Sequence, residues 1–178
     1  MKVDYREACL LYAKLPAFAR KVKRANAVTQ EAIELQDIRW YVAFSGGKDS
    51  EVVLDMVSSA LPNITAMWGD DGWDYPETLV FIGETEARYG IRIMRIKNRG
   101  NIAGFAAWAG CDDWRGANPG PWDHECASFD DHSRLIRELG FGGVFLGLRK
   151  QESTRRLFAL RRSGPLYWTK RERIWHCC

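Results

Sequence analysis

Apolar residues recur at two spacings along this chain, and the two spacings alternate from about residue 39 onward. Short runs of β-favouring apolar residues predict strands, whereas apolar residues three or four positions apart predict helices. We expect strands at 39–44, 64–68, 91–96 and 143–148, and helices at 48–60, 76–89 and 128–139. This alternation predicts an α/β fold with a mostly parallel, twisted sheet and helices on both faces.

The remaining segments have other patterns. Residues 5–36 are predicted to form an N-terminal helical region that Pro16 divides in two. Residues 98–127 are rich in Gly, Pro and Trp and are predicted to be irregular, with a short helix at 103–109. A short helix and a hairpin over 165–175 follow the last strand. The length of 178 residues is that of one domain, spanning 1–178.

A glycine-rich segment joins the first of these strands to its helix. It reads Ser45, Gly46, Gly47, Lys48, Asp49 and Ser50. Two glycines allow a tight turn close to an anion, and the first N–H groups of a helix have no partner within it. The segment therefore predicts a phosphate site, with Lys48 as a cation. Asp49 beside a phosphate favours a cap on backbone N–H groups or a bridging Mg²⁺ ion.

Two further polar segments follow the carboxyl ends of predicted strands. They contain Asp70, Asp71, Gly72 and Trp73 after the second strand, and Arg149, Glu152, Ser153 and Arg156 after the last. In parallel sheets ligands bind beyond these ends, so we expect the segments to converge on one site. A guanidinium binds oxyanions bidentately, and Glu152 lies four residues before Arg156, where the two side chains can pair.

Three motifs in this order resemble those of one family. The Ser45–Ser50 segment resembles the PP-loop of the ATP pyrophosphatase superfamily. The segments 70–78 and 147–156 resemble DTGxxFPET and G-[IL]-R-x-x-[EQ]-S-x-x-R of the phosphoadenosine phosphosulfate (PAPS) and APS reductases. The resemblance covers roughly residues 35–165 and suggests a short phage or accessory member with a fold like that of the PP-loop adenine nucleotide alpha-hydrolases.

The resemblance implies an adenine-nucleotide ligand, which is PAPS, APS or ATP. The 45–50 loop would hold the phosphate or sulfate end, residues 68–73 would border the adenosine, and Arg149 and Arg156 would bind the anionic groups. In a complete member, a cysteine thiolate reduces PAPS to sulfite with a thioredoxin-like reductant. Its Glu-Cys-Gly-Leu-His tail is not found here. The catalytic residue is therefore unassigned, since Cys177 and Cys178 show no feature that would activate them.

Two other functions remain open. The first is a Mg-ATP pyrophosphatase or adenylating enzyme of the PP-loop class, in which Asp49 helps to hold the metal. The second is a non-catalytic nucleotide-sensing or partner-binding module, suggested by charge. From Arg149 onward there are nine Lys/Arg and two Glu, which gives +7, whereas the first 148 residues carry −4. A basic face of this kind suits nucleic acid or is simply solvated.

Cysteine and histidine usage argues against a tightly bound cofactor. The five cysteines form no Cys-x-x-Cys pair, so neither an iron–sulfur cluster nor a disulfide framework is expected. His124, Cys126 and His132 match no zinc spacing and are expected to be loop polar groups and a buried thiol. Trp108, Trp114 and Trp122 could stack on a base, but we expect core packing for at least two of them.

The N-terminus is too charged for a secretory signal, and no apolar run approaches the roughly 20 residues of a membrane span. We therefore expect a cytoplasmic protein without a membrane partner. A homodimer is compatible with the sequence.

Overall fold

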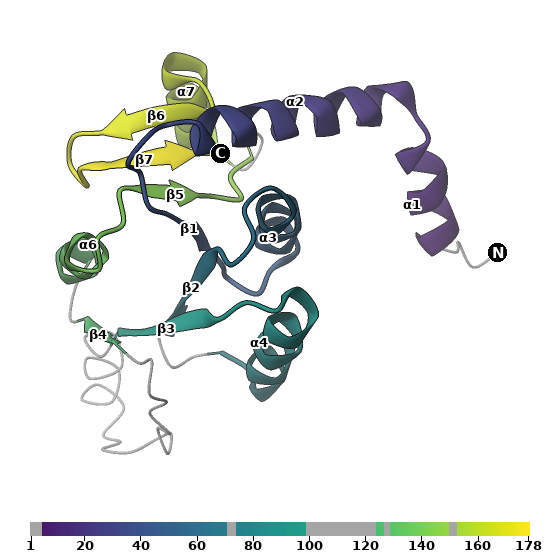
Figure 1. The fold of residues 1–178 in the computed structure, drawn as a ribbon. Coiled ribbons are helices and arrows are strands. Elements are labelled where there is room, and N and C mark those ends of the chain that lie inside the picture. The colour runs from purple at the N-terminus through teal and green to yellow at the C-terminus, as the bar shows by residue number, and fades with distance from the viewer. Residues whose placement is uncertain (1–4, 71–73, 99–123, 127–128, 150–152) are drawn as a thin grey trace.

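The computed structural model describes residues 5–70, 74–98, 124–126, 129–149 and 153–178 (Figure 1). Within them, one sheet has the strand order β4-β3-β2-β1-β5-β7-β6. The strands are β1 (Trp40–Ala43), β2 (Thr65–Asp70), β3 (Ile93–Asn98), β4 (His124–Cys126), β5 (Gly143–Phe145), β6 (Leu166–Thr169) and β7 (Ile174–Cys177). All neighbours are parallel except the antiparallel pair β6–β7, so the predicted, mostly parallel α/β fold is confirmed.

Helices cover both faces of the sheet, as predicted (Figure 1). They are α1 (Tyr5–Ala13), α2 (Pro16–Ile33), α3 (Lys48–Ala60), α4 (Pro76–Tyr89), α6 (Phe129–Glu138) and α7 (Thr154–Ser163). Successive side chains of strand β1 point to opposite faces of the sheet. Val42 packs with Leu54 against α2, α3 and α4, whereas Tyr41 packs with Ile136 of α6 on the opposite face. Both layers are apolar, so the sheet is buried by a hydrophobic layer on each side.

Helices α3 and α4 are the best predicted, and residues that favour helix ends lie at the bounds of α4. Helices α3 and α4 have the predicted bounds. Pro76 occupies the first turn of α4, and Gly90 ends that helix in the left-handed conformation at φ 62°. The N-terminal region is divided as expected, because Pro16 begins α2 after α1 has ended at Ala13.

Strand bounds were predicted less well. Strand β2 continues beyond the predicted end at residue 68 to Asp70, which pairs with Lys97 of β3. Strand β3 is displaced two residues toward the C-terminus, and β5 ends at Phe145 rather than 148. The prediction of irregular structure over 98–127 is wrong at 124–126, because these residues form β4 and pair with β3. Its sequence, His-Glu-Cys, has no strand pattern, so backbone pairing to β3 forms it.

The C-terminal hairpin confirms its prediction, with β6 and β7 on either side of residues 170–173. The expected helix at 103–109 and the cap at Ser128 lie outside the described residues. None of the described helices has the length and hydrophobicity that a membrane-spanning segment needs.

Strand β1 has β2 on one side and β5 on the other. The chain passes from β1 through α3 to β2 and returns to the other side of β1 only at β5. This reversal makes the carboxyl ends of β1 and β5 the switch point, where open α/β sheets bind ligands.

Candidate functional site

The loop between β1 and α3 is closed by its own hydroxyl groups. Ser45 and Ser50 share a hydrogen bond of 3.1 Å between their Oγ atoms, and Ser50 Oγ donates to the carbonyl of Gly47 at 2.8 Å. Gly46 has φ 71°, a left-handed conformation that favours glycine. Gly47 is the N-cap residue of α3 and has no side chain that could accept a hydrogen bond from the first N–H groups of the helix. The loop therefore has a fixed shape and leaves the first N–H groups of α3 available to an anion.

Arg149 reaches this loop from β5. Its Nε atom lies 3.1 Å from Oδ2 of Asp49, and Lys48 Nζ lies 3.2 Å from the same oxygen. The side chains of Arg149 and Lys48 are 53% and 75% exposed, so these ion pairs add little stability. They place two cations at the N-terminus of α3, where the helix dipole is also positive.

Gly147 allows β5 to approach so closely. A Cβ atom added at Gly147 would lie 2.9 Å from both the carbonyl carbon and the oxygen of Asp49. Because Gly147 is not in a left-handed conformation, space alone excludes a side chain there. The glycine lets the segment before Arg149 pack directly on the first turn of α3.

Asp70 has a partner within the sheet. Its side chain is only 6% exposed, and Oδ2 accepts hydrogen bonds from Arg95 Nε at 2.8 Å and from Nη2 at 2.5 Å. The same guanidinium lies 5.2 Å from the ring centroid of Trp68. This pair explains why β2 extends to Asp70, since a buried carboxylate needs a charged partner. The contact of Asp70 with nucleotide remains a prediction.

The third predicted segment is described in part. Ser153 caps α7 by accepting a hydrogen bond from the Arg156 N–H at 3.2 Å, so the Ser153 hydroxyl is engaged in the fold. The side chain of Arg156 is exposed. Glu152 lies outside the described residues, as do Asp71, Gly72 and Trp73 and the tryptophans at 108, 114 and 122, so their predicted roles remain predictions.

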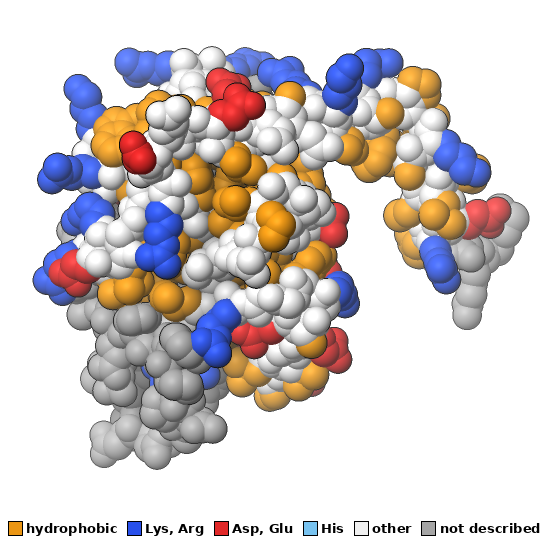
Figure 2. All heavy atoms as spheres, in the orientation of Figure 1, with side chains coloured by type: hydrophobic (Ala, Val, Ile, Leu, Met, Phe, Trp, Pro, Cys, Tyr) orange, Lys and Arg blue, Asp and Glu red, His pale blue; other side chains and the backbone are white. Residues whose placement is uncertain are grey.

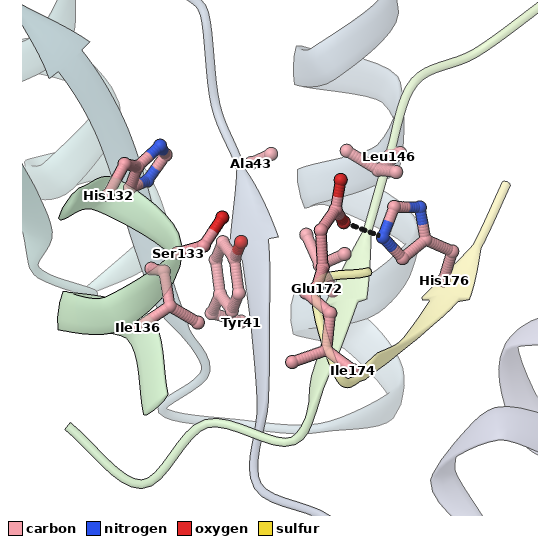
Figure 3. Close-up of a pocket in the computed structure, with 10 residues that line it drawn as sticks. Tyr41, Ala43, His132, Ser133, Ile136, Leu146, Glu172, Ile174 and His176 are labelled. Atoms are coloured by element: carbon pink, nitrogen blue, oxygen red, sulfur yellow. Dashed lines mark hydrogen bonds and ion pairs between the residues drawn. The ribbon is translucent and has the colours of Figure 1, made fainter. Parts of the chain in front are cut away.

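A cavity of about 230 Å³ lies on the α6 face of the switch point (Figure 3). Tyr41 and Ala43 of β1, and Val144 and Leu146 at β5, form its floor. The other lining residues come from α6 and the C-terminal hairpin and are His132, Ser133, Ile136, Glu172, Ile174 and His176.

The polar groups of this cavity were not predicted. Glu172 Oε2 lies 2.5 Å from His176 Nε2, and the hydroxyl of Tyr41 points into the same space (Figure 3). Burial raises the pKa of Tyr41, and the negative charge of Glu172 raises it further. Tyr41 lies in a strand that is otherwise apolar, so the sequence does not mark it as a functional residue. The four-residue spacing of Glu172 and His176 is the one sequence feature that could have suggested that these two side chains pair.

His132 makes the stability of this region depend on pH. Burial lowers the pKa of His132, although the negative charge of Glu172 opposes the shift. Since the unfolded state takes up the proton first, the contribution of His132 to stability is present above pH 6.5 and is lost as pH falls below it. We expect urea unfolding at pH 7.5 and 5.5 to show a larger loss for the wild type than for His132→Gln. Equal losses in both proteins would contradict this assignment.

Burial disfavours the thiolate form of both Cys177 and Cys178. Burial is the main cause that raises the pKa of Cys177 to about 12 and that of Cys178 to about 11. The Sγ atom of Cys177 also lies 3.9 Å from the carbonyl oxygen of Val28. A thiolate is the reactive form, so neither side chain is set up to attack a sulfonate.

Alkylation measures this difference directly. At pH 7.5 we expect iodoacetamide to modify the exposed Cys9 more than about a hundredfold faster than the buried Cys177 and the partly buried Cys178, because few of these two thiols are ionised. Peptide mapping over time gives the three rates, and labelling in urea is the control in which the difference should disappear. Native labelling of Cys178 as fast as that of Cys9 would show an accessible, activated thiol.

No group of three metal-ligating side chains is found in the described part of the chain. His124 and Cys126 belong to β4 rather than to a loop, and their side chains are outside the description. Asp49 is a single carboxylate, which suits Mg²⁺ only where a ligand's phosphates supply further oxygens.

Comparisons with known proteins identify relatives of this chain. A model of the phosphoadenosine phosphosulfate reductase domain matches residues 39–163. An uncharacterized protein of Methanocaldococcus jannaschii is 34% identical over 119 residues, which cover 65% of this chain and 24% of that protein. The phosphoadenosine 5'-phosphosulfate reductase of Thiocapsa roseopersicina is 30% identical over 112 residues, which cover 63% and 47%. The chain thus spans less than half the length of these two relatives.

Solved structures share the fold. The phosphoadenylyl-sulfate reductase of Candida auris, in a phosphate complex, has a TM-score of 0.57 at 19% identity, over 86% of this chain and 70% of that one. The FMN adenylyltransferase of Candida glabrata, in complex with ATP, has a TM-score of 0.54 at 13% identity, over 89% and 50%. The family model covers most of the chain, and the chain belongs to the phosphoadenosine phosphosulfate reductase family.

Proposed function

We propose that this chain binds an adenine nucleotide where β1 and β5 end, and that the nucleotide is PAPS or APS. The 45–50 loop would hold the phosphate or sulfate end, residues 68–73 would border the adenosine, and Arg156 would reach a further anionic group. The observation that carries the proposal is the meeting of Arg149 with Lys48 and Asp49 at the start of α3.

The ion pairs at Asp49 suggest how an anion enters. Arg149 and Lys48 both contact Oδ2 of Asp49, and all three side chains are at least partly exposed. An incoming phosphate carries more charge than one carboxylate and can accept from a guanidinium and an ammonium together. The N–H groups of α3 would bind the same phosphate. Binding would then move the two cations from Asp49 to the ligand.

The reaction proposed for a complete member begins with attack of a cysteine thiolate on the sulfonate sulfur. The sulfur–oxygen bond to the phosphate breaks, and adenosine 3',5'-bisphosphate leaves when PAPS is the substrate. The resulting thiosulfonate would be reduced by a thioredoxin-like dithiol, which releases sulfite and becomes a disulfide. The name of the Thiocapsa roseopersicina relative supports this reaction class. For the present chain we propose nucleotide binding and assign no nucleophile.

Calorimetric titration with PAPS, APS, ATP and adenosine 3',5'-bisphosphate tests the proposal. We expect PAPS or APS to bind at least about tenfold more tightly than ATP, a difference of about 1.4 kcal/mol. Absence of binding by all four ligands would contradict a nucleotide site. Sulfite release from PAPS or APS with a dithiol reductant tests the reductase reaction, on this chain and on any longer natural form. No sulfite from either form would remove the reductase assignment.

Asp49 favours a second candidate, a Mg-ATP pyrophosphatase or adenylating enzyme. Its carboxylate lies in the first turn of α3, inside the predicted phosphate loop. Together with ATP phosphates it would hold Mg²⁺, which would neutralise charge on the phosphates. Magnesium-dependent release of pyrophosphate from ATP, at a rate that falls in Asp49→Asn, would support this candidate. Tight nucleotide binding without either reaction would instead indicate a nucleotide-sensing module.

A further inference from the structure

The N-terminal arm, residues 5–27, projects from the body of the protein (Figure 1). It comprises α1 and the first two thirds of α2. No residue of α1 is buried, and three leucines are largely exposed, Leu10 at 59%, Leu11 at 59% and Leu15 at 46%. Exposed leucines in such number usually mark a surface that contacts something else.

The apolar residues of α2 form a stripe along one face of the helix. This stripe continues past the part of α2 that packs on the core. Near the C-terminal end of α2, Ala32 and Thr29 are buried against the core. The same helical face continues outward to Val22, which is 37% exposed, and to Phe18. Phe18 contacts Tyr12 edge-on at 5.3 Å between ring centroids, so α1 packs on α2 and covers only part of the stripe.

The arm and the α3–α4 region have opposite charge. The arm carries six basic side chains and one acidic one, namely Arg6, Lys14, Arg20, Lys21, Lys23 and Arg24 against Glu7. Helices α3 and α4 together carry six acidic side chains and two basic ones, namely Asp49, Glu51, Asp55, Glu77, Glu84 and Glu86 against Lys48 and Arg88. The arm therefore has a net charge of +5 and the two helices a net charge of −4, so the two surfaces are complementary. Because Asp49 and Glu51 of α3 already pair with Lys48, Arg149 and Arg88, the acidic side chains considered for a partner are those of α4.

The acidic helices also expose apolar side chains. Val52 of α3 is 59% exposed, and Leu79 and Val80 of α4 are 40% and 63% exposed. Glu77 and Glu84 are exposed on α4, one turn on either side of Val80. We call these five residues the α3–α4 face. Figure 2 shows mainly hydrophobic and basic side chains along the arm, and hydrophobic and acidic side chains with a few basic ones on the body near α3 and α4.

We propose that the arm of one copy docks on the α3–α4 face of a second copy, and that the exchange is reciprocal. Leucines of the arm would cover Val52, Leu79 and Val80, while the basic side chains of α2 pair with Glu77 and Glu84. Both copies use the same two surfaces, so the contact closes as a two-fold dimer. The inference goes beyond nucleotide binding and does not depend on it.

A second copy fits this surface better than a nucleic acid. A nucleic acid would satisfy the basic side chains but would leave the exposed leucines in water. In the described conformation the arm does not cover the α3–α4 face of its own chain, because no residue of α1 is buried. A second copy supplies both the acidic charge and the apolar surface.

Charge reversal on each surface tests the proposal by sedimentation equilibrium of the full chain. We expect the wild type to be a dimer, and we expect Arg20→Glu/Arg24→Glu and Glu77→Lys/Glu84→Lys each to raise the dimer dissociation constant at least about tenfold. In an equimolar mixture of the two variants, every arm meets a face of opposite charge. The mixture should therefore form heterodimers. Arg161→Glu/Arg162→Glu on α7 has the same charge change as the arm variant and should leave the dimer intact.

Three results would overturn the proposal. The first is a monomeric wild type at micromolar concentrations in low salt. The second is a dimer whose dissociation constant is unchanged in both reversed variants, with circular dichroism showing intact folds. The third is fluorescence anisotropy that shows a monomer binding labelled DNA or RNA through Arg20 and Arg24, since the arm would then serve a nucleic acid.

Discussion

Replacing Arg149 with alanine is expected to weaken binding of the favoured nucleotide at least tenfold, or about 1.4 kcal/mol. The guanidinium lies beside Asp49 at the start of α3, where it can bind a phosphate with two parallel hydrogen bonds. Its side chain is 53% exposed and its ion pair adds little to stability, so the fold should not change. Calorimetric titration gives the affinity, and thermal unfolding checks the fold.

Matched variants separate geometry from charge. Lys48→Ala removes the second cation on Asp49 Oδ2 and should also cost at least about tenfold in affinity. Arg149→Lys keeps the charge but loses the bidentate geometry, so its affinity should fall between those of the wild type and the alanine variant. Arg161→Ala removes an exposed arginine of α7 and should have no effect. Unchanged affinity in both Arg149→Ala and Lys48→Ala, with intact folds, would refute the site.

Local sequence signals predicted the helices better than the strands. Helix α4 begins at a proline and ends at a glycine, so its bounds are encoded within the segment itself. Strand β4 has only the residues His124–Cys126 and depends on pairing with β3, which lies more than 25 residues earlier in the chain. Strand β2 extends to Asp70 because Arg95 of the neighbouring strand neutralises that carboxylate. Such contacts between distant segments are invisible to a local pattern.

The site was predictable as far as parallel topology determines it. Ends of parallel strands share one edge of the sheet, which was enough to expect Arg149 near the 45–50 loop, and the structure brings Arg149 to Asp49. Lys48 and Arg149 contact the same oxygen atom of Asp49 because of their side-chain conformations. The spacing of residues along the chain does not determine these conformations. The cavity beside Tyr41 was missed for a related reason, because Glu172 and His176 lie about 130 residues away in the sequence.

Gly147→Ala is expected to impair both the fold and the nucleotide site. The new Cβ atom would lie 2.9 Å from the backbone carbonyl of Asp49 and 3.1 Å from the Ser50 nitrogen, so backbone rather than a flexible side chain must move. Overpacking of this kind costs about 1–3 kcal/mol in the free energy of unfolding. Since the displaced atoms belong to the first turn of α3, we also expect nucleotide affinity to fall at least about tenfold.

Gly83→Ala on α4 is the matched control, because a Cβ atom at Gly83 would have no neighbour within 4 Å and the residue lies outside the segments proposed to bind the nucleotide. Urea unfolding and calorimetric titration of both variants distinguish the close approach at Gly147 from a general effect of replacing glycine. Equal stability in the two variants would mean that β5 does not press on α3 in solution. A loss of stability in Gly147→Ala with unchanged affinity would mean that the strain is relieved away from Asp49. The phosphate site would then be independent of the packing that delivers Arg149.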